Sequence, residues 1–182
     1  MNEFSLICRI LGSLFNRSPQ DPLLTPLMTL LREKKLASQW PLEQDDLLDK
    51  LQQSSQSEDL QNDYQQLFIG AECSVPPFAS HRQTQFSEDG LRTFLTERGM
   101  PVGELPVDHI GAILLAASWL EDQRQDDESE ALEILFTTYL LPWCGPFLGK
   151  MEAHATTLFY RTLAILSREA IQALYDELQD AE

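Results

Sequence analysis

The stretch Glu104-Leu-Pro-Val-Asp-His-Ile-Gly-Ala-Ile-Leu-Leu-Ala-Ala-Ser-Trp-Leu120 decides the fold, because a polar entry here runs directly into the most apolar helix-like segment of the chain. Pro106 disfavours helix for the residue before it, and Asp108 is a good N-cap, so the spacing predicts a helix that has His109 in its first turn. We expect this helix to be central, since apolar residues recur along it at spacings of three and four: Ile110, Ile113, Leu114, Ala117 and Leu120.

The same periodicity predicts helices along the rest of the chain, and no convincing strand alternation or repeat is present. The sequence therefore indicates an all-α, single-domain helical bundle over residues 1–182. The expected helices lie between Phe4 and Leu14, from a cap at Asp21 to Leu31, from about Leu42 to Leu51, from a cap at Ser57 to a stop at Gly70, from a cap at Ser87 to Gly99, from Leu132 to a break at Pro142, from Trp143 to Met151, and from Phe159 to Leu178.

One segment is expected to be extended rather than helical. Val75-Pro-Pro-Phe-Ala-Ser80 contains two prolines, which lack backbone donors and restrict the residues before them. A helical stripe of Tyr64, Leu67 and Phe68 precedes it, and such a stripe usually belongs to a core. A second use is one wall of an apolar groove that also includes Phe78. Trp143, at a proline-broken junction, has the same two readings: core or pocket lining.

Composition narrows the class of partner. The 182 residues suit one domain and contain 13 Lys plus Arg against 29 Asp plus Glu, a formal net charge of −16. This charge argues against nucleic acid and anionic membranes as partners and favours a basic one. Cys8, Cys73 and Cys144 are far apart and show no paired spacing, which fits reduced thiols in the cytosol. We find no secretory or membrane-spanning signal, so a cytoplasmic protein is expected.

Catalytic signatures are lacking in the sequence. His81, His109 and His154 are well separated, and no metalloprotease helix, phosphate loop or nucleophile elbow is present. The acidic run Glu121–Glu130 has no ordered ligand pattern, so no metal site is predicted. Asp108 and His109 could act as orienter and base, but neighbouring residues at a helix start point in different directions, and the alternative is a cap beside a hydrogen-bonded histidine. We expect no enzyme activity and no cofactor.

Four segments, taken in order, resemble the TorD/DmsD family of redox-enzyme maturation chaperones, and within it the YcdY-type branch. The resemblance covers nearly the whole chain, and its most specific part is the pattern E-x-P-x-D-H, matched by Glu104, Pro106, Asp108 and His109. The four segments are Asp63-Tyr-Gln-Gln-Leu-Phe-Ile-Gly70, Val75-Pro-Pro-Phe-Ala-Ser80, Glu104-Leu-Pro-Val-Asp-His-Ile-Gly111 and Leu140-Leu-Pro-Trp143.

The resemblance implies an all-α chaperone that binds an immature metalloenzyme, commonly through a twin-arginine leader, until its cofactor is inserted. An acidic surface could steer paired arginines, an apolar groove could accept the leader's hydrophobic part, and Asp108 could accept a hydrogen bond from an arginine. The residues implied for client binding are Tyr64, Leu67, Phe68, Gly70, Pro76, Pro77, Phe78, Ser80, Glu104, Pro106, Asp108, His109 and Trp143.

The sequence departs from the family pattern in three places. Ala71 stands where proline is common, Phe78 where tyrosine is common, and Ile113 where a glutamate is often found. Because an acid is missing at Ile113, we keep open a metal-dependent client that has no twin-arginine leader. The resemblance also raises a dimer made by exchanging terminal helices about a hinge at 103–106, as well as weak guanine-nucleotide binding, although no phosphate loop is visible.

Two other classes stay open at this stage. One is an adaptor or activator that binds a folded metal-dependent enzyme, and it should prefer the mature partner, whereas a chaperone should prefer an unfinished one. The other is a small hydrolase using Asp108 and His109, which would turn over substrate without any partner. The main expectation is a cytoplasmic, non-catalytic maturation chaperone, either a monomer or a domain-swapped dimer.

Overall fold

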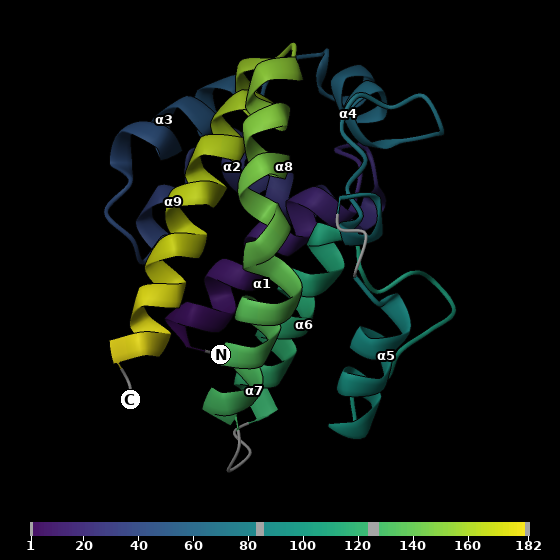
Figure 1. Cartoon of the computed structure of the whole chain (residues 1–182). Helices are drawn as coiled ribbons and strands as arrows, with labels where there is room; N and C mark the ends of the chain where they lie inside the picture. The colour runs from purple at the N-terminus through teal and green to yellow at the C-terminus, as the bar shows by residue number, and fades with distance from the viewer. Residues whose placement is uncertain (1, 83–85, 124–127, 181–182) are drawn as a thin grey trace. The chain divides into compact units, whose positions relative to one another are not determined.

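A computed structural model describes residues 2–82, 86–123 and 128–180 (Figure 1), and the regular structure in these ranges is helical apart from one isolated antiparallel bridge between Phe78 and His109. The predicted all-α class is therefore confirmed. The α-helices are α1 (Glu3–Asn16), α2 (Thr25–Arg32), α3 (Asp45–Ser54), α4 (Leu60–Phe68), α5 (Glu88–Glu97), α6 (Ile110–Gln123), α7 (Glu128–Ile134), α8 (Leu141–His154) and α9 (Leu158–Asp180); short 3-10 turns are η1 (Pro22–Leu24), η2 (Ala37–Gln39) and η3 (Ala79–His81), and η4 (Leu135–Leu140) is a π-helix.

Backbone contacts divide the chain into two compact units, each assembled from separated segments. The first unit contains α1, η3, α5, α6, α7 and η4, and the second contains η1, α2, η2, α3 and α4. The division falls inside two helices, after Cys144 in α8 and after Ala173 in α9. Another boundary between the units falls in the proline-rich segment: the stretch of the second unit ends at Pro76, and the next stretch of the first unit begins at Pro77.

The first unit is built on the close packing of α1 against α6 (Figure 1). Gly12 and Gly111 permit this close approach. A Cβ atom placed on Gly111 would lie 2.7 Å from the backbone carbonyl oxygen of Gly12 and 2.7 Å from the backbone nitrogen of Asn16. Deeper in the same contact, the buried hydroxyls of Ser5 and Ser118 are 2.8 Å apart and hydrogen bond to each other. The predicted apolar stripe of the central helix is buried, as expected.

The predicted helix break at Pro142 is wrong. The chain runs from Glu128 to His154 as one helical stretch, and the widened π turns of η4 immediately precede the proline. In a regular α-helix the proline ring would clash with the carbonyl four residues earlier, and the wider turns relieve that clash. Leu141 accordingly donates to the Phe136 carbonyl, five residues back.

This long helical stretch is also the one described helix that is long and apolar enough to cross a membrane. Length and composition alone give that result, and half of its most apolar window is buried inside the structure. Burial of this kind is what a core helix shows, because a lipid-facing helix would leave its apolar side chains uncovered by protein.

Helix ends follow the predicted signals at several positions. The Asp21 and Ser87 side chains accept hydrogen bonds from Leu23 and Gly90, as N-caps do, and Gly70 and Gly99 follow α4 and α5 with φ angles of +90° and +84°. Two expected starts are wrong. α3 begins at Asp45 rather than near Leu42, and Ser57 accepts from the Asp59 amide in the turn before α4 instead of capping that helix.

Candidate functional site

The strongest local geometry among the predicted site residues joins the proline-rich segment to the entry of α6, inside the first unit. Asp108 makes two of the contacts: its backbone carbonyl accepts from the Ala79 amide at 3.0 Å, and its Oδ2 accepts from the Ser80 amide at 3.0 Å. The Ile110 amide donates to the Pro77 carbonyl at 2.9 Å. We call these three bonds the latch. They connect residues that lie about thirty positions apart and fix the segment 77–80 against the α6 entry.

His109, and not Asp108, caps α6. The imidazole Nδ1 accepts from the Gly111 amide at 2.9 Å, whereas the Asp108 carboxylate is turned toward Ser80, so the predicted Asp108 cap is wrong. An imidazole that accepts at Nδ1 must carry its proton on Nε2 and be neutral. Burial lowers the pKa of His109 to about 4 even though the Asp108 charge raises it. With one nitrogen capping the helix and the other protonated, this imidazole has no free lone pair for general-base chemistry.

The ring of His109 also supports the proline-rich segment. Phe78 meets His109 edge to face at a centroid separation of 5.3 Å and meets His81 in the same manner at 5.7 Å. Such edge-to-face pairs contribute about 0.5–1.5 kcal/mol beyond the area they bury. Phe78 is therefore held between two imidazoles while its side chain stays only half-buried.

A second set of bonds holds the loop that precedes Asp108. Arg92 of α5 donates to the Gly103 carbonyl at 2.6 Å and to the Leu105 carbonyl at 2.9 Å, and it pairs with Glu88 at 2.8 Å. Glu88 in turn accepts from the Val107 amide at 3.1 Å. Burial raises the pKa of Glu88, but the hydrogen bonds from Val107 and Arg92 outweigh this, and the net pKa lies below its usual value. Three hydrogen bonds thus anchor the loop, and the Arg92–Glu88 pair holds the two anchoring side chains together; residues 103–106 of the loop are exposed.

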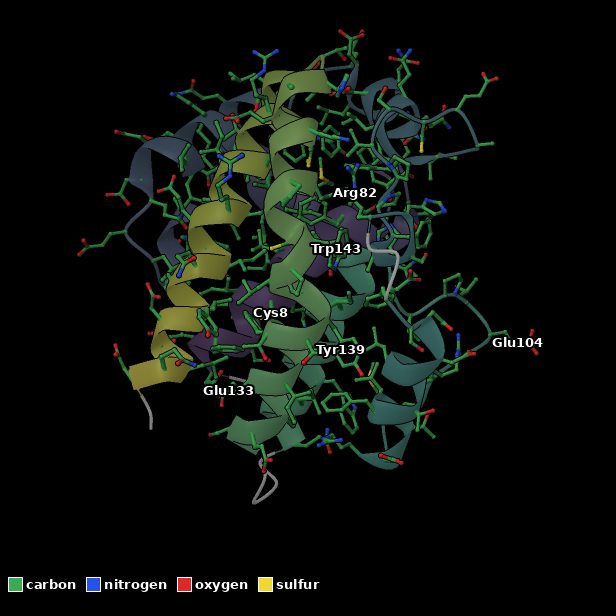
Figure 2. All side chains as sticks on the ribbon, in the orientation of Figure 1. Cys8, Arg82, Glu104, Glu133, Tyr139 and Trp143 are labelled. Carbon is green, nitrogen blue, oxygen red and sulfur yellow. The ribbon has the colours of Figure 1, made fainter. Side chains whose placement is uncertain are left out.

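The anchored loop displays its predicted site residues to solvent. Glu104 extends from the outer end of the loop, away from α5 and α6 (Figure 2), and Pro106 is exposed as well. Between them Leu105 is 81% exposed, the highest value among the large apolar residues of the described chain. The E-x-P-x-D-H motif therefore separates into an exposed half, 104–106, and a half that makes internal hydrogen bonds, Asp108 and His109.

The first family motif lies in the second unit, where its apolar residues form core. Tyr64, Leu67 and Phe68 are each less than 5% exposed. Phe68 stacks on Phe147 at 6.1 Å, and Tyr64 and Phe68 both meet the ring of Tyr160. Burial raises the pKa of Tyr64 to about 12, as expected for a phenol removed from water. Within their unit these three residues are therefore part of the core, which is the first of the two roles predicted for the stripe.

Asp63, the first residue of that motif, has a structural role that the sequence analysis did not predict. Its carboxylate is 1% exposed and accepts from the Thr156 amide at 3.1 Å, the Thr157 amide at 3.0 Å and the Thr157 hydroxyl at 2.6 Å. It therefore caps the start of α9 from a different helix. The available signal was an aspartate at an otherwise apolar position of the stripe, but its partners lie more than ninety residues away.

The outer face of α4 is different in character. Ile69 is 56% exposed, and a hollow of about 370 Å³ lies beside it, lined by amide side chains of the helix and by Glu72, Cys73 and Ser74. Cys73 is partly accessible there, whereas Cys8 and Cys144 are buried. Gly70 is exposed at the end of this helix.

Trp143 is a core residue in the first unit. It is 1% exposed, and its indole donates to the Tyr139 carbonyl one turn earlier at 2.7 Å (Figure 2). Tyr139 itself contacts the rings of Phe86 and Phe94, which ties η4 to α5. The pocket-lining reading of Trp143 thus has little exposed surface to support it.

Among the described residues no cluster of three His, Cys, Asp or Glu side chains is placed to hold a metal ion.

Burial sorts the predicted client-binding residues into three groups. The exposed members are Gly70, Ser80, Glu104 and Pro106; the half-buried members are Pro76, Phe78 and His109; and the buried members are Tyr64, Leu67, Phe68, Pro77, Asp108 and Trp143.

Comparisons with known proteins agree with this architecture. A family model described as "Nitrate reductase delta subunit" matches residues 33–149. The chain is 62% identical over 180 residues to the chaperone protein YcdY of Escherichia coli (strain K12). The matched region covers 99% of this chain and 98% of that relative. It is 33% identical over 180 residues to the Tat proofreading chaperone DmsD of Salmonella typhi, covering 92% of this chain and 86% of the relative.

The all-helical fold of the described residues and relatives named as chaperones over nearly the whole chain together define a maturation chaperone. The chain belongs to the TorD/DmsD family, as the resemblance of its four motifs predicted. Its role is accordingly in the maturation of redox enzymes, and it is not itself an enzyme.

Proposed function

We propose that this chaperone binds an immature metalloenzyme in the cytoplasm, either a molybdoenzyme or another metal-dependent protein, and holds it for cofactor insertion. The observation that carries the proposal is a set of solvent-facing residues on two anchored segments of the first unit, 77–80 and 103–107, which we call the anchored surface. There the exposed residues Ser80, Glu104 and Pro106, the exposed Leu105 and the half-buried Phe78 belong to two segments whose backbones are fixed by hydrogen bonds. A rigid surface of this kind binds with less loss of conformational entropy.

The chemistry of this surface suits an unfinished client. Apolar side chains would take up hydrophobic segments that the mature enzyme buries, and Glu104 together with the net charge of −16 would attract basic ones. A leader with paired arginines and an apolar segment has both features. Relatives named Tat proofreading chaperones support a leader as the bound element.

Ile113, which raised the possibility of a client without such a leader, is fully buried in α6. Its side chain offers no surface to a client, so an acid at this position would not be available as a surface group here. Ile113 therefore gives no reason to prefer a client without a leader.

Co-purification from the host's own cytosol tests the proposal. A tagged wild-type protein would be run beside a Phe78→Ser, Glu104→Arg double variant, with bound proteins identified by mass spectrometry. An Asp49→Arg variant is the matched control, because this exposed acid lies in α3 of the second unit. We expect a metalloenzyme precursor with the wild type and the control, and its loss with the double variant.

The second candidate is an adaptor or activator of a folded metal-dependent enzyme. It is distinguished by the state of the captured partner, since a chaperone prefers the cofactor-free or partly unfolded form. Equal recovery of mature, metal-loaded enzyme by all three proteins would favour the adaptor and remove Phe78 and Glu104 from the site.

A further inference from the structure

The buried half of the E-x-P-x-D-H motif has a different role from the exposed half. Asp108 is 2% exposed, and its carboxylate already accepts from the Ser80 amide. A guanidinium group needs open access to a carboxylate to pair with it in the forked geometry that arginine prefers. The Asp108 side chain lacks that access while the latch is closed.

His109 is likewise committed within the fold. Its Nδ1 caps α6 through the Gly111 amide, and its ring supports Phe78. Both contacts lie within the protein: one is with the first turn of α6 and the other is with the segment 77–80. Removing the ring would leave a helix N-terminus uncapped and one side of Phe78 without its contact.

The residues that the latch holds are better placed to meet a client. Ser80 is exposed, and Phe78 is half-buried between His81 and His109. Each is attached to backbone that the latch bonds fix from the Pro77 carbonyl to the Ser80 amide. If this backbone shifted by one ångström, the Phe78 and Ser80 side chains would shift with it, although neither residue had been substituted.

We infer that Asp108 and His109 are positioning residues, which fix the segment Pro77–Ser80 so that Phe78 and Ser80 can contact the client, and that the buried carboxylate of Asp108 does not contact the client itself. This inference rests on the proposed function for the nature of the partner. It assigns the acid–imidazole pair of the motif to the architecture of the site and the neighbouring segment to recognition.

Conservative substitution separates positioning from direct contact. Asp108→Asn keeps an oxygen that can accept from the Ser80 amide but removes the charge that an arginine would read, whereas Asp108→Ala removes both. The probe is a fluorescein-labelled synthetic peptide with paired arginines followed by an apolar segment, and its affinity is measured by anisotropy. We expect Asp108→Ala to weaken binding about tenfold or more and Asp108→Asn to stay within about threefold of wild type.

Hydrogen exchange provides a readout that needs no ligand. In the Asp108→Ala protein the Ala79 and Ser80 amides should exchange faster, while the amides of α1 keep their wild-type protection. Glu97→Ala is the control, since this exposed acid of α5 lies in the same unit. It should change neither exchange nor peptide affinity.

A double variant tests whether Asp108 acts through Phe78. If positioning is correct, Phe78→Ala removes most of what the latch organises, so adding Asp108→Ala should lower affinity by much less than tenfold. Fully additive losses would indicate independent contacts and overturn the inference.

Two further outcomes would overturn it. One is a loss with Asp108→Asn as large as with Asp108→Ala, and the other is unchanged exchange of the 79 and 80 amides in the alanine variant. A wild-type protein that fails to bind the peptide would instead count against leader recognition in the proposed function, and the exchange data would still decide whether Asp108 holds the segment.

Discussion

Replacing Asp63 by alanine should destabilise the second unit strongly. The carboxylate accepts three hydrogen bonds at the start of α9, two of them from Thr157, which is 7% exposed. Thr156 is exposed, so water can replace the bond to its amide. The amide and hydroxyl of Thr157 would remain buried without an acceptor, and each such group costs about 1–3 kcal/mol. We therefore expect a loss of about 3–4 kcal/mol in the free energy of unfolding.

The assay is urea denaturation followed by far-ultraviolet circular dichroism. Asp63→Asn keeps one accepting oxygen but places an amide donor where the second oxygen was, so its loss should be about half as large. Asp59→Ala is the matched control, because Asp59 lies four positions earlier, is exposed and makes no side-chain cap bond. That change should stay within about 0.5 kcal/mol of wild type.

The reasoning would be refuted if Asp63→Ala lost less than about 1 kcal/mol, or no more than the Asp59 variant. Either result would mean that the three bonds are replaced by water at little cost, and that α9 does not depend on a cap supplied by α4. A change in the slope of the transition would point to an altered unfolded state instead.

Three further outcomes follow from the structure. Gly111→Ala should lower stability by about 1–3 kcal/mol, because its Cβ would meet backbone of α1 at 2.7 Å, whereas Gly103→Ala, with open space around it, should be near neutral in thermal melts. The pKa of His109 is about 4 in the folded protein and near 6.5 in the unfolded chain, so the unfolded state binds more protons between these values. The free energy of unfolding should therefore fall as the pH drops from about 6.5 to 4, by at most about 3 kcal/mol. The difference in stability between wild type and His109→Asn across this range measures the effect, and a difference that does not change with pH would contradict the assigned cap. In native buffer a thiol reagent should modify Cys73 alone, with the two buried cysteines, including Cys8 whose pKa burial raises, reacting only in denaturant; rapid labelling of all three would be inconsistent with this packing.

Much of the fold was predictable from local signals. Apolar spacing of three and four located the helices, and the caps at Asp21 and Ser87 and the stops at Gly70 and Gly99 were placed correctly because each acts through its own neighbours. The errors occurred where the expected local signal was replaced by a different helix geometry or by a hydrogen-bond partner far away in the sequence. Pro142 remains within a helix because π turns precede it, and the residue that caps α6 is His109 because Asp108 has a better partner in Ser80.

The candidate site was predictable only in part. Its segments were found from the order of the four motifs, and the chain's membership of the family is confirmed, but the roles of individual residues could not be read from a linear pattern. Spacing marks Asp108 as important without showing that its partner is the Ser80 backbone. In the same way, Arg92 gave no signal because both carbonyls it holds belong to a loop more than ten residues away.

The sequence by itself determined the helical class, most helix ends and the family, since these depend on periodicity, capping and ordered motifs within short stretches of chain. The tertiary structure decided which motif residues are core, which form the latch and which face solvent. The physical reason is that burial and hydrogen-bond partners depend on segments that meet only after folding: Asp63 with Thr157, and Asp108 with Ser80. A carboxylate that looks the same in the sequence becomes a cap, a latch or, at Glu104, an exposed charge according to what the folded chain brings to it.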